Sequence, residues 1–313
     1  MDSVPIVKEI PVLDLGQAQG KERAVVARQI LKALEEYGFF QIINHGVPQV
    51  LMDEAMKVCQ EFFNLPMEEK VHYAKETETL YTSNPKHYVS EEHQYWKEVL
   101  EHNCNIDGED QNTWPSNPPK YREVIGQYSF EVRKLSKIIL DLVAEGLGLE
   151  AGFFGKEHGQ RMFVNHYPVC PDPSLTLGTG GHCDPNLITI SQQQVYGLQI
   201  LKNEEWIGLE PLPHAFVVNF GLPITVISNG KLTSVAHRAV TNTTQSRTAI
   251  GIQLSKKRMK RETRTATPPE DTGETPVDRR CLLRRERLAT NGSGISTGES
   301  LVPIQMVLEL TGH

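Results

Sequence analysis

The chain has 313 residues, of which 39% are hydrophobic and 23% charged, a hydrophobic fraction too high for a disordered protein. Its formal net charge of −7 gives no support for binding nucleic acid or an anionic membrane. No apolar run approaches the roughly 18 residues of a membrane span, and the N-terminus lacks a signal-peptide pattern. Five scattered cysteines without C-x-x-C spacing argue against a disulfide framework or a structural zinc site. We therefore expect a cytoplasmic globular protein.

The first part of the chain, residues 1–118, is expected to be a mixed region rich in helix. Helical periodicity alternates there with β-prone runs, which predicts a strand at 10–15, a helix at 21–37, a strand at 39–43 and a helix at 51–62. Residues 80–118 lack a clear period, so we expect loops and short helices in that stretch.

The clearest helix is expected from about Lys120 to Leu147, where apolar residues recur every three or four positions. Gly146 and Gly148 would end it. At 1.5 Å per residue it would span roughly 40 Å, so we assign 119–150 as a helix that braces a whole domain.

Residues 151–254 change to short β-prone runs between turns. The expected strands are 187–190, 198–201, 215–219, 225–227 and 249–254. Many short strands at near-regular spacing favour an antiparallel sandwich or barrel over a parallel sheet.

Residues 255–313 differ in composition from the rest of the chain. They contain eight arginines and no Phe, Trp or Tyr, because the last aromatic residue is Phe220. One interpretation is a disordered basic tail. The other is a sequence not shaped to fold on this domain, such as a shifted reading frame or an altered splice product.

Two histidines and an aspartate carry the strongest indication of chemistry. His182 and Asp184 are two positions apart, so on a strand both side chains would point to the same face. His237 lies farther along the chain and can complete the set from a neighbouring strand. Two imidazoles and one carboxylate on one side of a metal are typical of non-haem Fe(II) oxygenases. A His-x-Asp pattern alone is weak evidence, since it arises often by chance.

Further motifs surround these residues in a fixed order: Gly38–Pro48, Phe62–Pro66, Asn165–Pro171, Gly197–Gln199, Val217–Gly221 and Ser228–Gly230. Together with Arg247 they resemble the plant 2-oxoglutarate- and Fe(II)-dependent dioxygenases over about residues 8–254. Tyr95–Glu98 and Asn219–Leu222 are most similar to the branch that contains hyoscyamine 6β-hydroxylase and deoxymugineic acid dioxygenase.

The resemblance implies a mainly β fold with helices, in which residues 151–254 form a double-stranded β-helix (jelly roll) and the N-terminal region is helical. It implies that His182, Asp184 and His237 bind Fe(II). The enzyme would use 2-oxoglutarate and O2 to hydroxylate or desaturate a small specialised metabolite, releasing succinate and CO2, with ascorbate in support. The family suggests a monomer.

The resemblance also assigns the cosubstrate site. Arg247 matches the arginine that pairs with the distal carboxylate of 2-oxoglutarate, for which a planar guanidinium is well suited. Tyr167 matches a tyrosine that donates to the same carboxylate, and Asn165 matches a position near the cosubstrate. His45 and His166 are interpreted as structural, and Cys183 is expected to point away from the metal.

The sequence departs from the family pattern in two places. The family usually has Arg-x-Ser at the cosubstrate site, whereas this chain has Arg247-Thr248-Ala249. An uncompensated loss of that hydroxyl would cost about 1.5–3 kcal/mol of binding free energy. The tail does not resemble the C-terminal helices that help to enclose the family's substrate pocket.

Three alternatives to an active 2-oxoglutarate enzyme stay open from the sequence. The first is a non-catalytic or unstable relative whose pocket is incomplete because of the tail. The second is a nucleic-acid-binding module, which the acidic core and the lack of aromatics in the tail oppose. The third is the relative that oxidises aminocyclopropane carboxylate without 2-oxoglutarate, which Arg247 and Tyr167 disfavour.

Overall fold

The computed structural model of the chain describes residues 6–7, 10–74, 79–83, 94–104, 109–155 and 158–256. Residues 1–256 form one compact unit. The last described residue, Lys256, ends a strand, so this strand extends two residues beyond the expected boundary of the core at 254. The rest of the atypical tail lies outside the described residues.

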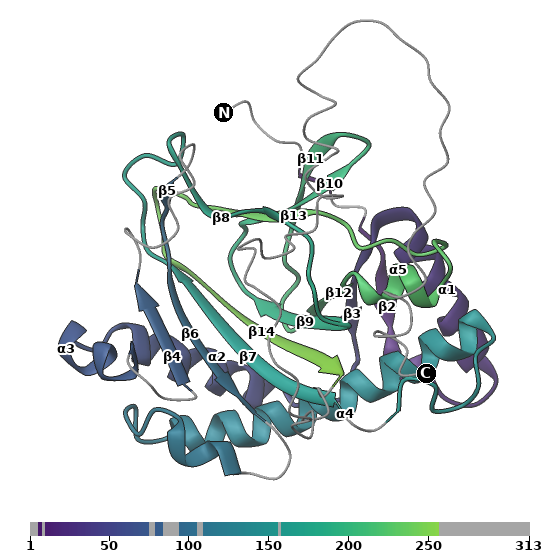
Figure 1. The fold of residues 1–313 in the computed structure, drawn as a ribbon, viewed down its shortest axis with the longest axis horizontal. Coiled ribbons are helices and arrows are strands. Elements are labelled where there is room, and N and C mark those ends of the chain that lie inside the picture. The colour runs from purple at the N-terminus through teal and green to yellow at the C-terminus, as the bar shows by residue number, and fades with distance from the viewer. Residues whose placement is uncertain are drawn as a thin grey trace, which may run out of the picture. The chain divides into compact units, whose positions relative to one another are not determined.

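Two β-sheets face each other, as the ribbon in Figure 1 shows. The larger has the order β2 (Val12–Asp14), β3 (Phe39–Ile43), β12 (Phe216–Phe220), β9 (Ile188–Gln193), β14 (Arg247–Lys256), β7 (His158–Tyr167), β6 (Glu98–Asn103) and β4 (Thr79–Ser83). The smaller has the order β1 (Ile6–Val7), β11 (Glu205–Leu209), β10 (Leu198–Lys202), β13 (His237–Val240), β8 (Thr176–His182) and β5 (Gln94–Tyr95). Nine of the twelve strand pairs among the described residues are antiparallel, and the three parallel pairs are β1–β11, β2–β3 and β5–β8. The chain has the jelly-roll fold expected from its sequence.

Helices cover the outside of the larger sheet. The α-helices are α1 (Arg23–Tyr37), α2 (Gln49–Phe63), α3 (Met67–Lys70), α4 (Tyr121–Leu147) and α5 (Pro223–Ile227). The 3₁₀ helices are η1 (Leu15–Gln17), η2 (Gly20–Glu22), η3 (Val71–Ala74) and η4 (Glu109–Thr113). Both α2 and α4 contact β14, and their buried faces join that sheet in the main hydrophobic core. The inner face of the larger sheet carries polar residues such as Thr189 and Asn219. It also carries Phe39 and Val217, which form a second, smaller core with residues of β10 and β11.

The long helix α4 confirms the strongest element predicted from sequence. Its buried residues follow the expected three- and four-residue spacing along all 27 residues. Gly148 ends it in the left-handed conformation, with φ of 71°, which a residue without Cβ adopts at little cost. Gly146, by contrast, still lies inside the helix.

Two sequence predictions of local structure were wrong. Residues 225–227 form the end of helix α5 rather than a strand, because Pro223 occupies the first helical turn and presets its backbone angle. Residues 80–118 contain the expected short helix, η4, but also the strands β4, β5 and β6 in place of loops. Acidic residues interrupt the alternation of apolar and polar residues that would indicate strand β6 in the sequence. Their basic partners come from distant parts of the chain, as when Glu98 pairs with Lys70 at 2.7 Å.

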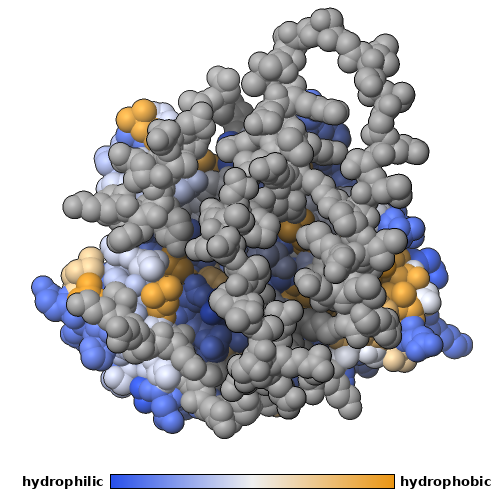
Figure 2. Space-filling view, in the orientation of Figure 1, coloured by the Kyte–Doolittle hydropathy of each residue, from blue (hydrophilic) through white to orange (hydrophobic). Residues whose placement is uncertain are grey.

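None of the helices in the described part of the chain is long and apolar enough to cross a membrane. On the face drawn in Figure 2, hydrophobic side chains of these residues are scattered among hydrophilic ones. The four cysteines that the structure describes form no disulfide with one another.

The turn after β3 contains a histidine that must stay neutral. His45 Nδ1 accepts a hydrogen bond from the Val47 amide at 3.2 Å, while Nε2 lies 2.9 Å from the His214 carbonyl oxygen, to which it can donate. Burial lowers the pKa of His45, against a smaller rise from the His214 carbonyl. Protonation of Nδ1 would also break the bond from Val47.

We therefore expect acid to destabilise this fold through His45. The unfolded chain takes up this proton first as pH falls, so the free energy of unfolding declines below about pH 6.5, by at most about 1.4 kcal/mol per pH unit for one histidine. Urea unfolding of wild type and His45→Gln between pH 5 and 8 measures this slope. The exposed His72→Gln is the matched control, and an equal slope in wild type and His45→Gln would contradict the expectation.

Candidate metal centre and cosubstrate site

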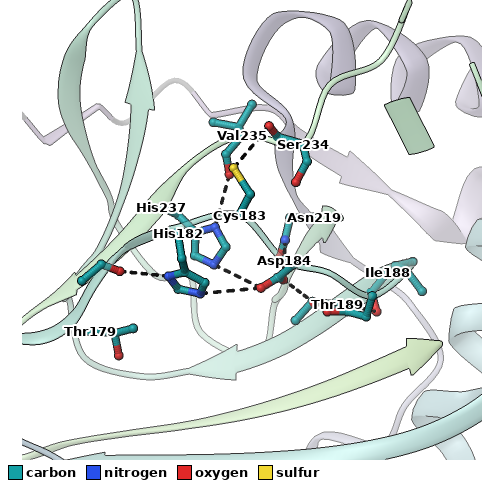
Figure 3. Close-up of polar contacts among 12 residues, drawn as sticks. Thr179, His182, Cys183, Asp184, Ile188, Thr189, Asn219, Ser234, Val235 and His237 are labelled. Atoms are coloured by element: carbon teal, nitrogen blue, oxygen red, sulfur yellow. Dashed lines mark hydrogen bonds and ion pairs between the residues drawn. The ribbon is translucent and has the colours of Figure 1, made fainter. Parts of the chain in front are cut away.

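Three side chains converge where strands of the smaller sheet meet a loop (Figure 3). His182 ends β8 and lies directly opposite His237, the first residue of β13. Asp184 follows two residues after His182, just beyond the strand. Its Oδ1 lies 3.6 Å from His182 Nε2 and 3.7 Å from His237 Nε2. In the described part of the chain, this is the one cluster of His, Cys, Asp and Glu with metal-ligand spacing.

Backbone carbonyls orient both imidazoles. His182 Nδ1 lies 2.9 Å from the Gly180 carbonyl oxygen, and His237 Nδ1 lies 3.3 Å from that of Val235. Since a carbonyl can only accept, each Nδ1 carries the proton and each Nε2 presents its lone pair. Such a bond fixes the tautomer and the ring orientation of a metal-ligating histidine.

Polar residues of the larger sheet hold the carboxylate. Asp184 Oδ2 accepts hydrogen bonds from Thr189 Oγ1 at 2.6 Å and from Asn219 Nδ2 at 2.8 Å. These two bonds leave Oδ1 directed at the histidines. Sequence reasoning missed both roles, although a polar side chain inside the apolar run 216–220 is a signal that could have found Asn219.

The electrostatics of the cluster favour a neutral histidine beside an ionised carboxylate. Burial, with a smaller contribution from the neighbouring His182, lowers the pKa of His237 to about 4. Burial alone would raise the pKa of Asp184, but His237 and the hydrogen bonds from Thr189 and Asn219 outweigh burial and bring it below the ordinary value. Both protonation states are those a metal ligand requires at neutral pH.

This donor set fits Fe(II). Two imidazole nitrogens and one carboxylate oxygen lie within 4.8 Å of one another. These are the ligands of the facial triad of non-haem iron oxygenases. Cys183, between the two ligands, points away from the cluster, with its Sγ 3.8 Å from the Ser234 carbonyl oxygen, as expected (Figure 3).

Arg247 begins β14 and is buried, with 4% of its surface exposed. Its Nε donates to the Val195 carbonyl at 3.0 Å and one terminal nitrogen donates to Gln193 Oε1 at 2.5 Å. Its other terminal nitrogen, Nη1, is buried without a hydrogen-bond partner among the described residues, and no carboxylate of those residues forms an ion pair with Arg247. A buried guanidinium without a counter-charge is costly, so its surroundings fit an anionic ligand.

Tyr167 and Asn165 lie on the neighbouring strand β7. Tyr167 is directly opposite Arg247, whose guanidinium carbon is 5.0 Å from the centre of the tyrosine ring. The Tyr167 hydroxyl lies 3.3 Å from Thr179 Oγ1, on the strand that carries His182. Asn165 is opposite Ala249 and half-buried. The structure thus brings these predicted cosubstrate residues onto one strand pair.

The residues around Ala249 agree with their expected orientation. Thr248 points to the other face of the sheet, where its Oγ1 lies 2.9 Å from His166 Nδ1. His166 stacks on Phe63, a residue of the helical layer, which supports its interpretation as structural. No hydroxyl of the Arg247-Thr248-Ala249 segment therefore lies on the face of Arg247.

Comparisons with known proteins agree with this geometry. A family model for the 2OG-Fe(II) oxygenase superfamily matches residues 158–256, and a model for the N-terminal region of non-haem dioxygenases in morphine synthesis matches residues 10–121. Hyoscyamine 6-dioxygenase of Hyoscyamus niger is 46% identical over 263 residues, which are 79% of this chain and 75% of that protein. The chain belongs to the 2OG-Fe(II) oxygenase superfamily.

Other members of this superfamily extend the match. The 2'-deoxymugineic-acid 2'-dioxygenase of Hordeum vulgare is 37% identical over 80% of this chain and 76% of that protein. A crystal structure of JOX2 in complex with 2OG, Fe and JA is 35% identical, with a TM-score of 0.73 over 82% of this chain and 78% of that one. The protein is therefore a 2-oxoglutarate-dependent dioxygenase that uses Fe(II), as its sequence motifs indicated.

Proposed function

We propose that His182, Asp184 and His237 hold the Fe(II) of this dioxygenase, and that Arg247, Tyr167 and Asn165 bind its 2-oxoglutarate. The convergence of two fixed Nε2 lone pairs and Oδ1 of Asp184 carries the first assignment. The assignment of the 2-oxoglutarate site rests on Arg247, whose buried charge has no counter-charge among the described residues and therefore needs a carboxylate partner.

Iron and 2-oxoglutarate, when bound, would together activate O2 for the oxidation of a substrate C–H bond, with succinate and CO2 as co-products. The chain supplies the positioning. Thr189 and Asn219 hold the Asp184 carboxylate, and Gly180 and Val235 hold the rings through their carbonyls. Thr189, Asn219 and Gly180 belong to strands, and Val235 lies two residues before β13. The ligand atoms are therefore already oriented before metal binds.

We infer that the substrate is a small specialised metabolite that is hydroxylated or desaturated. The names of similar proteins support this class, since hyoscyamine 6-dioxygenase and 2'-deoxymugineic-acid 2'-dioxygenase both carry a small metabolite in their names. We also propose that the protein is a cytoplasmic monomer and that ascorbate supports its activity as a reductant. Its proposed regions are the N-terminal mixed region (1–118), the long helix (119–150), the jelly-roll core (151–254) and the tail (255–313). The described residues contain nothing that favours a non-catalytic relative.

The test of the site is anaerobic titration calorimetry of the full chain with Fe(II), then with 2-oxoglutarate. We expect 2-oxoglutarate to bind only after Fe(II), and Arg247→Met to weaken that binding at least about 100-fold, since it removes the positive charge and the donor that face the distal carboxylate. Fe(II) binding should be unchanged in this variant. Release of succinate on exposure to O2 with candidate metabolites would then identify the substrate.

Arg161→Met is the matched control for Arg247→Met. Arg161 lies on the same strand pair, is exposed, and pairs with Glu101 at 2.7 Å. Its loss should leave both affinities unchanged. Binding of 2-oxoglutarate to Arg247→Met with wild-type affinity would contradict the assignment, and failure of wild type to bind Fe(II) would contradict the proposed function.

A further inference from the structure

Gln193 lies beside Arg247 at the end of β9 and is 4% exposed. Its Oε1 accepts the 2.5 Å hydrogen bond from Arg247. Since a guanidinium can only donate, the oxygen of the amide must face it, and Nε2 is directed elsewhere. The hydrogen bond therefore fixes the orientation of the amide.

This bond leaves two buried donors without partners. Neither Gln193 Nε2 nor Arg247 Nη1 has a hydrogen-bond partner among the residues that the structure describes, and both atoms are buried. Gln193 Nε2 is bonded to the same carbon as Oε1, the acceptor of the hydrogen bond from Arg247. The unpaired Arg247 nitrogen is bonded to the same carbon as the nitrogen that donates this hydrogen bond. Buried polar groups are rarely left unsatisfied, so adjacent orphaned donors indicate a missing acceptor.

The strand register places both donors on the face that carries the metal centre. Gln193 is directly opposite Ala249, and Ala249 is opposite Asn165 on the next strand. Arg247, two residues before Ala249, shares its face. Thr189, four residues before Gln193 on β9, is also on this face and contacts Asp184.

Ala249 is the position where the family pattern has serine. Its methyl group can donate no hydrogen bond, and the hydroxyl of Thr248 is engaged on the opposite face. The residue directly across from Ala249 on β9 is Gln193, the one with the orphaned amide donor. The donor absent from one strand is thus present on its neighbour.

We propose that Gln193 takes the place of the missing serine, donating from Nε2, together with Arg247 Nη1, to the distal carboxylate of 2-oxoglutarate. This inference rests on the proposed function, because it assigns a further residue to the same cosubstrate site. Gln193 then has two roles: Oε1 orients the guanidinium, and Nε2 binds the ligand.

Anaerobic calorimetry of the Fe(II)-loaded full chain separates these roles. The probes are 2-oxoglutarate and 2-oxobutanoate, which has the same 2-oxo acid group but lacks the distal carboxylate. We expect Gln193→Met to weaken 2-oxoglutarate binding about 10- to 100-fold, the effect of losing a hydrogen bond to a charged group, and to leave 2-oxobutanoate binding unchanged. Ala249→Ser should restore at least tenfold of the lost affinity in Gln193→Met, and improve wild type much less.

Three results would overturn the inference. Gln193→Met could bind 2-oxoglutarate as wild type does, which would mean that water satisfies the amide. It could lose affinity for both probes equally, which would indicate a general packing defect. Ala249→Ser could fail to rescue it, which would leave Gln193 only the orientation of Arg247.

A second variant keeps the test valid if Gln193→Met does not fold. Gln193→Glu retains the size and the acceptor for Arg247 but replaces the amide nitrogen with an oxygen that repels a carboxylate. It should lose more 2-oxoglutarate affinity than Gln193→Met, and an affinity equal to wild type would overturn the inference. If the wild-type chain binds Fe(II) but neither probe, the proposed cosubstrate site itself fails, which no Gln193 variant could produce.

Discussion

Asp184→Asn is expected to abolish Fe(II) binding and leave the apo fold intact. The amide has nearly the size of the carboxylate, and its oxygen can still accept from Thr189 and Asn219. Its nitrogen would then face the two histidine Nε2 atoms, where it donates instead of binding metal. The site loses its one negative charge and one of its three ligands.

Thermal unfolding under anaerobic conditions measures this effect. Fe(II) at a hundredfold excess over its dissociation constant adds about 2.7 kcal/mol to the stability of a protein that binds it only when folded. We expect that gain in wild type and none in Asp184→Asn. The matched control is Asp53→Asn, at an exposed carboxylate 3.0 Å from His214, which should retain the full gain. Equal stabilisation of Asp184→Asn and wild type would show that Asp184 is not a ligand.

The sequence predicted the elements whose signal is local. The spacing along α4 and the β-prone run of β3 needed no tertiary information, and both were found within a few residues of their bounds. It failed where distant partners decide the structure. From the sequence alone, Glu98 is typical of a loop. In the fold its carboxylate is stabilised by hydrogen bonds from Lys70 at 2.7 Å and Tyr81 at 2.5 Å.

The same distinction applies to the candidate site. The three proposed ligands were found because their order and spacing form a motif. Their supporting residues could not be found in this way, because Thr189 and Gln193 act through register across strands. A glutamine in a β-prone run carries no local sign that its amide faces a buried arginine. The pairing of β9 with β14 supplies that information.

Gly221 shows how closely the backbone packs around the proposed aspartate ligand. It follows β12, and its amide donates to the Leu187 carbonyl at 3.1 Å, while the next amide, of Leu222, donates to the Asp184 carbonyl at 2.8 Å. A Cβ at Gly221 would overlap the carbonyl oxygens of Asn186 and Asp184. Both are backbone atoms, so no side-chain rotation can relieve the clash.

Gly221→Ala should therefore destabilise the fold by about 3 kcal/mol, at the upper end of the usual cost of overpacking. The loop with Asp184 must shift to admit the methyl group, so we also expect weaker Fe(II) binding in the fraction that folds. Chemical unfolding and anaerobic Fe(II) titration measure the two effects. The matched control is Gly159→Ala on β7, where the nearest atom to an added Cβ is the Ser255 carbonyl oxygen at 4.0 Å. Wild-type stability in Gly221→Ala would contradict this packing, and lost stability with full Fe(II) affinity would show that the loop absorbs the shift without moving Asp184.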